Sequence, residues 1–178
     1  VTTTQEAGKT ELLQQAAELA RTSKGSGGPP HDQAEELIRS YYRHVAPEDL
    51  VDRSDADIYG AFASHYKLAA TRPQGTAKVR ITTPTVADTG WTAAGHTVVE
   101  VVVDDMPFLV DSLSMELSRQ MRDVHVVIHP NYDVVRDITG ELQSLVPVAD
   151  GALDPEGDAV RESWMHVEID RLPDGLTQ

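Results

Sequence analysis

The sequence predicts an α+β fold, in which an N-terminal helical subdomain precedes a β-sheet domain. Up to about residue 73, apolar residues recur at the spacing of helix turns, and beyond it they alternate or form β-branched runs, as in strands. The chain has 178 residues, 40% of them hydrophobic and 25% charged, which is the composition of a globular protein with room for a core. We therefore divide it into a helix plus flexible linker over 1–30, a helical subdomain over 31–73 and an α+β domain over 74–178.

The first helix is predicted over Glu6–Arg21, a stretch rich in the helix-favouring residues Ala, Leu, Glu and Gln. Its apolar residues fall on one side: Leu12, Leu13, Ala16, Leu19 and Ala20. The Gly, Ser and Pro residues of Thr22–Pro30 then indicate a flexible linker. We expect this helix to dock loosely, or against another part of a longer protein.

A second helix is predicted from the capping-box spacing of Asp32 and Glu35, with Asp32 as the N-cap. Its apolar stripe consists of Leu37, Ile38, Tyr41 and Val45. Pro47 ends this helix and can open a short one through Leu50.

A third helix is predicted to begin at Ser54, since Ser54 and Asp57 repeat the capping signal. Its apolar face holds Ile58, Tyr59, Phe62, Tyr66 and Ala69. The helix is expected to end near Thr71, because the residue that precedes Pro73 is disfavoured in helices.

Strand signals begin at Lys78–Thr82, which alternates polar and apolar residues and predicts a half-exposed strand, followed by a loop over 84–90. Thr97–Val103 is β-branched and almost wholly apolar, which predicts a central strand buried on both faces. A helix follows, with a predicted core face of Val110, Leu113, Leu117 and Met121. The remaining strands are expected at Val124–Ile128, Tyr132–Arg136 and, after an acidic loop over 150–158, at Ser163–Ile169.

The order after residue 95 is therefore β-α-β-β. A right-handed crossover would make the strands at 97–103 and 124–128 neighbours. This order predicts an incomplete ferredoxin-like βαββ sheet. The chain stops at Gln178, where the second helix would begin. We therefore expect a fragment of a longer protein or a fold completed by another chain. Without its fourth strand, Val98–Val103 would have an open edge, which predicts a dimer or a sheet-extended assembly.

Paired carboxylates at Asp104 and Asp105 could serve as an acid–base pair or bind magnesium, and Asp111 could join them. Acids are also favoured at the start of a helix, where they cap free N–H groups. We favour this second interpretation, with Asp111 as a solvated helix position.

Three histidines, His125, His129 and His166, could bind zinc if their strands lay close together. Strand histidines four residues apart are well separated, so we favour surface or partly buried histidines without a metal. The sequence contains no Gly-rich nucleotide-binding pattern and no Gly-x-Ser-x-Gly elbow. We expect this segment to hold no cofactor, no metal and no catalytic residue.

Composition narrows the classes of partner. The net charge of −14 argues against nucleic acid and against an anionic membrane surface. The absence of cysteine excludes disulfides, thiolate zinc sites and a cysteine nucleophile. Neither a signal pattern nor an apolar run of membrane-spanning length is present, so we expect a cytoplasmic protein.

One stretch resembles a known family. Gly90-Trp91 and the run His96–Ser112, with its Asp-Asp-Met-Pro-Phe-Leu-Val-Asp-Ser segment, resemble the N-terminal region of the large bacterial NAD-dependent glutamate dehydrogenases. Glu162–Asp170 and the helix containing Tyr41 and Tyr42 are similar to the same family, so the resemblance covers about residues 35–178. It implies an ACT-type domain, the ferredoxin-like module that often binds amino acids or mediates assembly in metabolic enzymes.

The resemblance also implies that catalysis takes place in other parts of a longer protein. The parent protein would be an oxidoreductase of amino-acid catabolism that oxidatively deaminates L-glutamate to 2-oxoglutarate and ammonium with NAD. Its catalytic lysines and Rossmann domain would lie outside this chain, which would be a non-catalytic structural or regulatory segment. Its expected partners are the rest of the parent enzyme, a second copy of the chain and an amino-acid effector; a stand-alone amino-acid-binding ACT-type sensor is the alternative.

The loop that the resemblance marks as an effector-binding or interface site contains Asp104, Asp105, Met106, Pro107, Phe108, Val110 and Asp111. Ligand-binding ACT modules usually place glycine after the proline of this loop, so that a ligand can approach backbone amides. Here Phe108 follows Pro107 and is expected to fill the space where an amino acid would sit. This difference favours a packing or assembly role.

Overall fold

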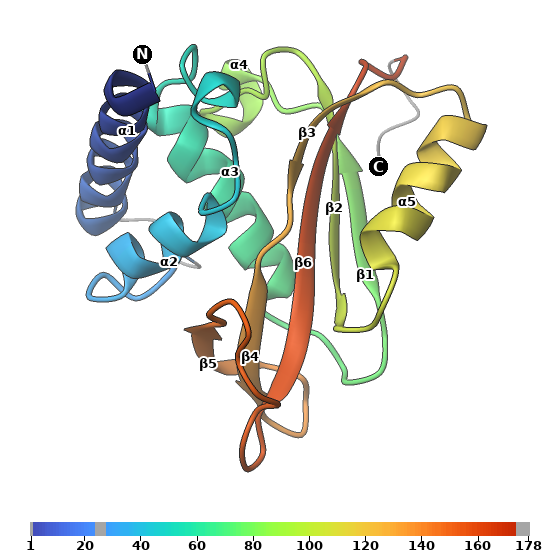
Figure 1. The fold of residues 1–178 in the computed structure, drawn as a ribbon. Helices are drawn as coiled ribbons and strands as arrows, with labels where there is room; N and C mark the ends of the chain where they lie inside the picture. The colour runs from blue at the N-terminus through green and yellow to red at the C-terminus, as the bar shows by residue number, and fades with distance from the viewer. Residues whose placement is uncertain (1, 24–27, 174–178) are drawn as a thin grey trace.

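The computed structural model describes residues 2–23 and 28–173, and Figure 1 shows their arrangement. The helices are α1 (Thr2–Thr22), α2 (Ala34–Tyr41), the 3-10 helix η1 (Pro47–Asp49), α3 (Asp55–Ala69), α4 (Val86–Thr89) and α5 (Leu109–Arg119). The strands are β1 (Lys78–Thr82), β2 (Thr97–Asp104), β3 (Val124–Ile128), β4 (Asn131–Arg136), β5 (Leu142–Pro147) and β6 (Val160–Ile169). Among these residues, no helix is both long and apolar enough to cross a membrane.

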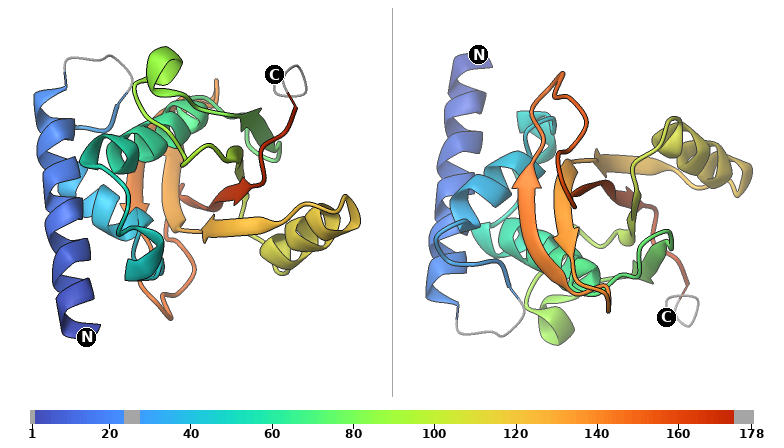
Figure 2. Two further views of the ribbon diagram at one scale, coloured as in Figure 1. Left: turned by 90° about the horizontal axis from the view of Figure 1, so that it is seen from above. Right: turned by 90° about the horizontal axis from the view of Figure 1, so that it is seen from below.

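The fold is mixed α+β, with one open antiparallel sheet of six strands. Its order is β1-β2-β6-β4-β5, and β3 also pairs with β6. Helices α1, α2 and α3 lie on one side of the sheet, and α5 lies on the other, as the views along the strands show (Figure 2). Each face of the sheet therefore has its own apolar core, one under the three N-terminal helices and a smaller one under α5.

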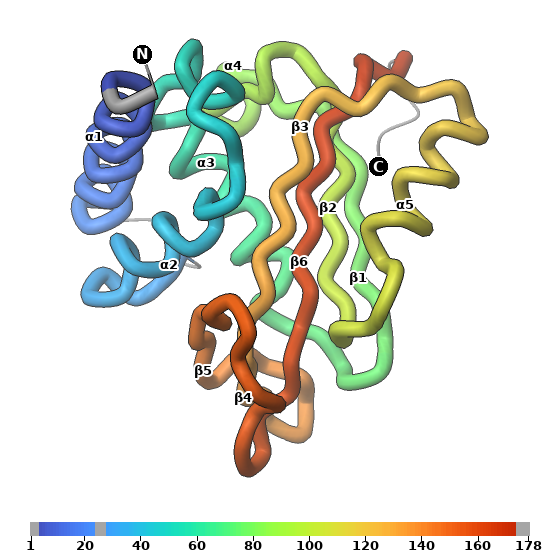
Figure 3. The backbone as a smooth tube through the Cα atoms, viewed as in Figure 1, coloured from blue at the N-terminus to red at the C-terminus, as the bar shows by residue number. Residues whose placement is uncertain are grey.

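Strands β3 and β4 run one after the other along β6 (Figure 3). The first half of β6 pairs with β4 and its second half with β3, with Pro130 between the two. Because proline has no N–H to donate, it interrupts the ladder at this point. Of the two relations that the sequence left open for residues 132–136, continuing the strand at 124–128 or pairing with it, the structure shows the first.

The predicted neighbour relation between β2 and β3 is wrong, because β6 lies between them and is antiparallel to both. Residues 162–169 are all buried, so β6 belongs in the middle of the sheet. The predicted open edge of β2 is also wrong. Strand β1 covers it, with Lys78 opposite Val102 and Thr82 opposite Val98.

Helix α1 packs against α2 and α3 through its small apolar side, burying Leu13, Ala16, Ala17 and Ala20. The expectation that it docks loosely or elsewhere is therefore wrong. Small side chains allow the helices to approach closely, and their core continues to Val102 and Trp164 of the sheet. Of the linker expected at Thr22–Pro30, residues 24–27 lie outside the described part. The proposed boundaries at 30 and 73 stay a prediction.

The capping predictions had different outcomes. Ser54 and Asp57 form the predicted capping box at the start of α3. Helix α2 instead begins at Ala34 after Gln33, without a side-chain cap. The carboxylate of Glu35 is engaged elsewhere, because it forms ion pairs with Arg21 and Arg39.

Three local differences concern short elements. The loop predicted at 84–90 contains α4, which Thr85 caps and Gly90 ends in the left-handed conformation. Strand β5 was not predicted. Met121, expected in the core, is 88% exposed because α5 ends two residues earlier, whereas Leu117 packs under the helix as predicted.

Candidate functional site

The β2–α5 loop binds the rest of the protein through its two acids. The Asp104 carboxylate accepts from Arg72 at 2.5 Å and from the Gly75 N–H at 3.1 Å. The Asp105 carboxylate accepts from the Ser163 hydroxyl at 2.5 Å. Neither acid caps α5, whose N-cap residue makes no side-chain cap, so our preferred interpretation of this pair is wrong.

The remainder of the loop faces outward. Met106 is 50% and Phe108 75% exposed, and Phe108 has a left-handed backbone with φ 67°. In the first turn of α5, Val110 is half-buried against the core beneath the helix and Asp111 is exposed. Most of the surface of Phe108 lies in solvent, and the expectation that it fills the space of an amino-acid ligand stays a prediction.

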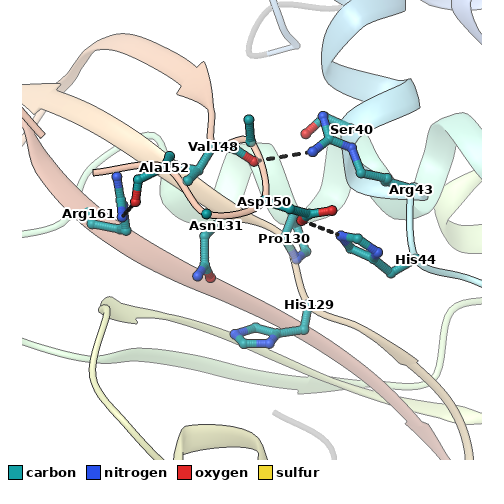
Figure 4. Close-up of a pocket in the computed structure, with 12 residues that line it drawn as sticks. Ser40, Arg43, His44, His129, Pro130, Asn131, Val148, Asp150, Ala152 and Arg161 are labelled. Carbon is teal, nitrogen blue, oxygen red and sulfur yellow. Dashed lines mark hydrogen bonds and ion pairs between the residues drawn. The ribbon is translucent and has the colours of Figure 1, made fainter. Parts of the chain in front are cut away.

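A cavity of about 240 Å³ lies between the end of α2, the β3–β4 junction and residues 148–152 (Figure 4). Its lining carries charges of both signs, Arg43 on one side and Asp150 from the facing loop, with His44 beside Arg43. Arg43 donates to the Val148 carbonyl at 3.3 Å, and His44 lies 3.4 Å from Asp150. These contacts hold the loop over the cavity.

Ser163 connects this cavity with the β2–α5 loop. Its hydroxyl donates to Asp105 and lies 3.2 Å from Nε2 of His129, which lines the cavity. Burial lowers the pKa of His129, so the neutral ring can donate its Nε2–H to this oxygen. The predicted loop and the cavity therefore share one hydrogen-bond chain.

The helix-facing side of β6 carries a row of polar residues whose burial the sequence did not predict. Glu162, His166 and Glu168 are each 0–1% exposed, because the N-terminal helices cover this face. Alternation of polar and apolar residues is typical of a half-exposed strand, so the pattern alone did not reveal their burial.

Arginines neutralise these buried acids. Arg53, just before α3, binds both carboxylate oxygens of Glu168 at 2.7 Å. Arg72, just after α3, and Arg136 of β4 bind Glu162 at 2.6–3.1 Å. Arginines at the two ends of one predicted helix are the signal that could have suggested buried acidic partners, since guanidinium groups bind carboxylates in this bidentate way.

The three histidines considered for zinc do not come together. His125 stacks on His96, with ring centroids 4.1 Å apart, and His129 contacts Ser163. In residues 2–23 and 28–173, the group with metal-binding side chains close together is instead His65, Glu100 and His166, all buried.

His65 is held as a neutral ring. Its Nε2 lies 3.1 Å from the Val101 carbonyl, which can only accept, so this nitrogen carries the proton. Nδ1 then accepts from the Tyr41 hydroxyl at 2.9 Å. Burial lowers the pKa of His65 to about 3, which keeps the ring neutral at physiological pH.

The chain is similar to known proteins. The matching family model is described as the glutamate dehydrogenase ACT1 domain and covers residues 37–177. An NAD-specific glutamate dehydrogenase of Halomonas elongata is 33% identical over 171 residues, which are 94% of this chain and 10% of that relative. One of Pseudomonas aeruginosa is 32% identical over 135 residues, 76% of this chain and 8% of the relative. The chain thus spans a tenth or less of these relatives, and no solved structure matches it.

Proposed function

The chain belongs to the glutamate dehydrogenase ACT1-domain family, and from this premise we propose that it is a non-catalytic structural and regulatory segment of a large NAD-dependent enzyme. The parent enzyme would convert L-glutamate to 2-oxoglutarate and ammonium, with NAD bound outside this segment. The observation that carries the proposal is the family match over 37–177 in a sequence without a nucleotide-binding motif. A cytoplasmic location remains part of the proposal.

We take the ferredoxin-like, ACT-type arrangement as the finer description of the sheet. Strands β2 and β3 are joined through α5 and separated by β6, which supports a split βαβ unit. Strand β1 lies beside β2, on the side away from β6.

The surface around α5 is proposed as the contact with the rest of the parent enzyme. Met106, Phe108, Met115 and Met121 are 50–88% exposed there. Contiguous exposed apolar patches are typical of interfaces, and we propose that these side chains form one. The relatives are about ten times longer than this chain, so a large partner within the same polypeptide is the one that we favour. A second copy of the chain is a further proposed partner, although β2 offers no free edge for it.

The first test is the size and activity of the native protein in its source cells. An antibody raised against this chain should detect a band many times larger than 19.4 kDa, in a fraction that reduces NAD when glutamate is added. A band near 19.4 kDa would overturn the proposal.

The second test addresses the α5 surface in the full-length enzyme. Phe108→Ser should weaken the docking of this segment on the rest of the polypeptide, measured as faster limited proteolysis between the segment and the remainder, because it removes an exposed apolar side chain from the proposed contact. Ile138→Ser is the matched control, since Ile138 is fully exposed in the β4–β5 turn on a different part of the molecule. Equal behaviour of the two variants would refute the assigned surface.

The cavity at the end of α2 favours a second function, an amino-acid sensor. Its charges of both signs, at Arg43 and Asp150, suit the carboxylate and ammonium groups of an amino acid. A ligand that binds the folded state raises its melting temperature. A panel of the twenty amino acids should then contain at least one that stabilises the wild type but not Arg43→Ala. No shift with any of them would refute the sensor.

A further inference from the structure

Near the centre of the sheet, two buried polar atoms of the described residues have no hydrogen-bond partner. They are Glu100 Oε1 and His166 Nδ1. Both side chains are 0% exposed and come from residues directly opposite each other on β2 and β6. The other oxygen of Glu100 accepts from Arg80 Nε at 2.7 Å, so Oε1 is the atom left over. Buried polar atoms normally have a bonding partner. A metal ion bound to both atoms would supply the partner that each of them lacks.

The two histidines of this group present the same nitrogen. His166 Nε2 lies 3.1 Å from the Glu168 carboxylate, and His65 Nε2 lies 3.1 Å from the Val101 carbonyl. Both partners are acceptors, so each ring carries a proton on Nε2, and a neutral ring held in this way offers the lone pair of Nδ1 to a metal ion. Histidines that bind metals are typically held in this way, by a carboxylate or a backbone carbonyl on the other nitrogen.

We infer that His65, Glu100 and His166 form a buried zinc site between α3 and the sheet. One potential ligand atom of each lies within 4.8 Å of those of the other two. Two imidazoles and one carboxylate are a donor set of zinc, whereas magnesium and calcium prefer oxygen alone. The two nitrogen donors and one oxygen donor therefore identify zinc as the expected ion.

Binding requires a small local adjustment. Ligands of a tetrahedral zinc ion lie roughly 3.4 Å apart, so the three side chains close up by rotation, and neither free atom loses a bond in doing so. The Tyr41 hydroxyl, 2.9 Å from His65 Nδ1, turns its hydrogen away. Its oxygen or a water molecule can then serve as the fourth ligand.

The test is a zinc titration of the chain after it has been stripped with a chelator, read with a chromophoric competitor. The wild type should bind one zinc ion per chain, and cobalt substituted for it should give the visible absorption of a tetrahedral ion. Glu168→Gln replaces the carboxylate that accepts from His166 Nε2, and it should raise the Kd for zinc about 10–100-fold. Glu100→Gln should raise it further, whereas His125→Gln, which alters a histidine stacked on His96 elsewhere, should leave it unchanged.

The wild-type titration decides the question even if a buried variant fails to fold. No stoichiometric zinc, or cobalt spectra of an octahedral aqueous ion, would overturn the site and indicate a bridging water or shared proton. Zinc bound by the wild type with equal Kd in Glu100→Gln would also overturn it. Loss of binding in His125→Gln would instead assign the metal to the surface histidines.

Discussion

Gly60, in the middle of α3, has a close neighbour that sets the effect of adding one methyl group. A Cβ at this position would lie 2.3, 2.4 and 2.6 Å from three atoms of Trp91. Ordinary contacts are about an ångström longer, and Trp91 is held in a small core by Ala61, Ala93 and Val98. Overpacking of this kind costs about 1–3 kcal/mol, and three simultaneous clashes place it near the upper limit. Replacing glycine by alanine in a helix interior gains about 1 kcal/mol. Gly60→Ala should therefore lower the free energy of unfolding by about 1–2 kcal/mol.

Urea unfolding followed by circular dichroism measures this difference, and Gly8→Ala provides the matched control. Gly8 lies inside α1 and a Cβ there would meet nothing within 4 Å, so helix propensity acts alone. Gly8→Ala should stabilise the chain by up to about 1 kcal/mol. Stabilisation by both substitutions would refute the close packing of Trp91 over α3.

Three further changes test other parts of the structure. Glu162→Gln should cost about 3–5 kcal/mol of unfolding free energy, because it leaves buried Arg136 without its counter-charge and removes one of the two carboxylates that pair with Arg72, whereas Glu18→Gln at an exposed ion pair should cost less than about 1. Ser54→Ala should lower the free energy by about 1 kcal/mol, through loss of the capping box; an unchanged urea midpoint would contradict that role. Burial lowers the pKa of His129 in the folded state, so the unfolded chain takes up the proton first and stability falls as pH drops through the ordinary value of 6.5. His129→Gln should therefore lose less stability than the wild type between pH 7.5 and 5.5, and identical losses would show that this histidine does not contribute.

Periodicity predicted most elements, because helix and strand spacing follow from local geometry. The buried stripe of α2, the capping box at Ser54 and the apolar strand β2 were all read from residues close together in the chain. Pairing could not be read in this way. Strand β6 lies between β2 and β3 through contacts across more than thirty residues, and no local pattern encodes such an insertion.

In the candidate site, too, local features could be predicted from the sequence and long-range contacts could not. The acids of the β2–α5 loop were singled out from the sequence, but their partners Arg72 and Ser163 lie far along the chain. His65 had no distinguishing sequence context. Its contact with Val101 arises because α3 packs across the sheet. Long-range packing, and not residue type, decides which polar side chains are buried.

The central position of β6 has a consequence for synthesis of the chain. Of the described strands, β6 leaves the ribosome last, yet it pairs with β2, β3 and β4. Until it arrives, the nascent chain holds three strands whose backbone groups lack their final partner, and such species are prone to misassembly. Translation speed between residues 136 and 169 should therefore influence the yield of soluble protein more than the same change made earlier in the message.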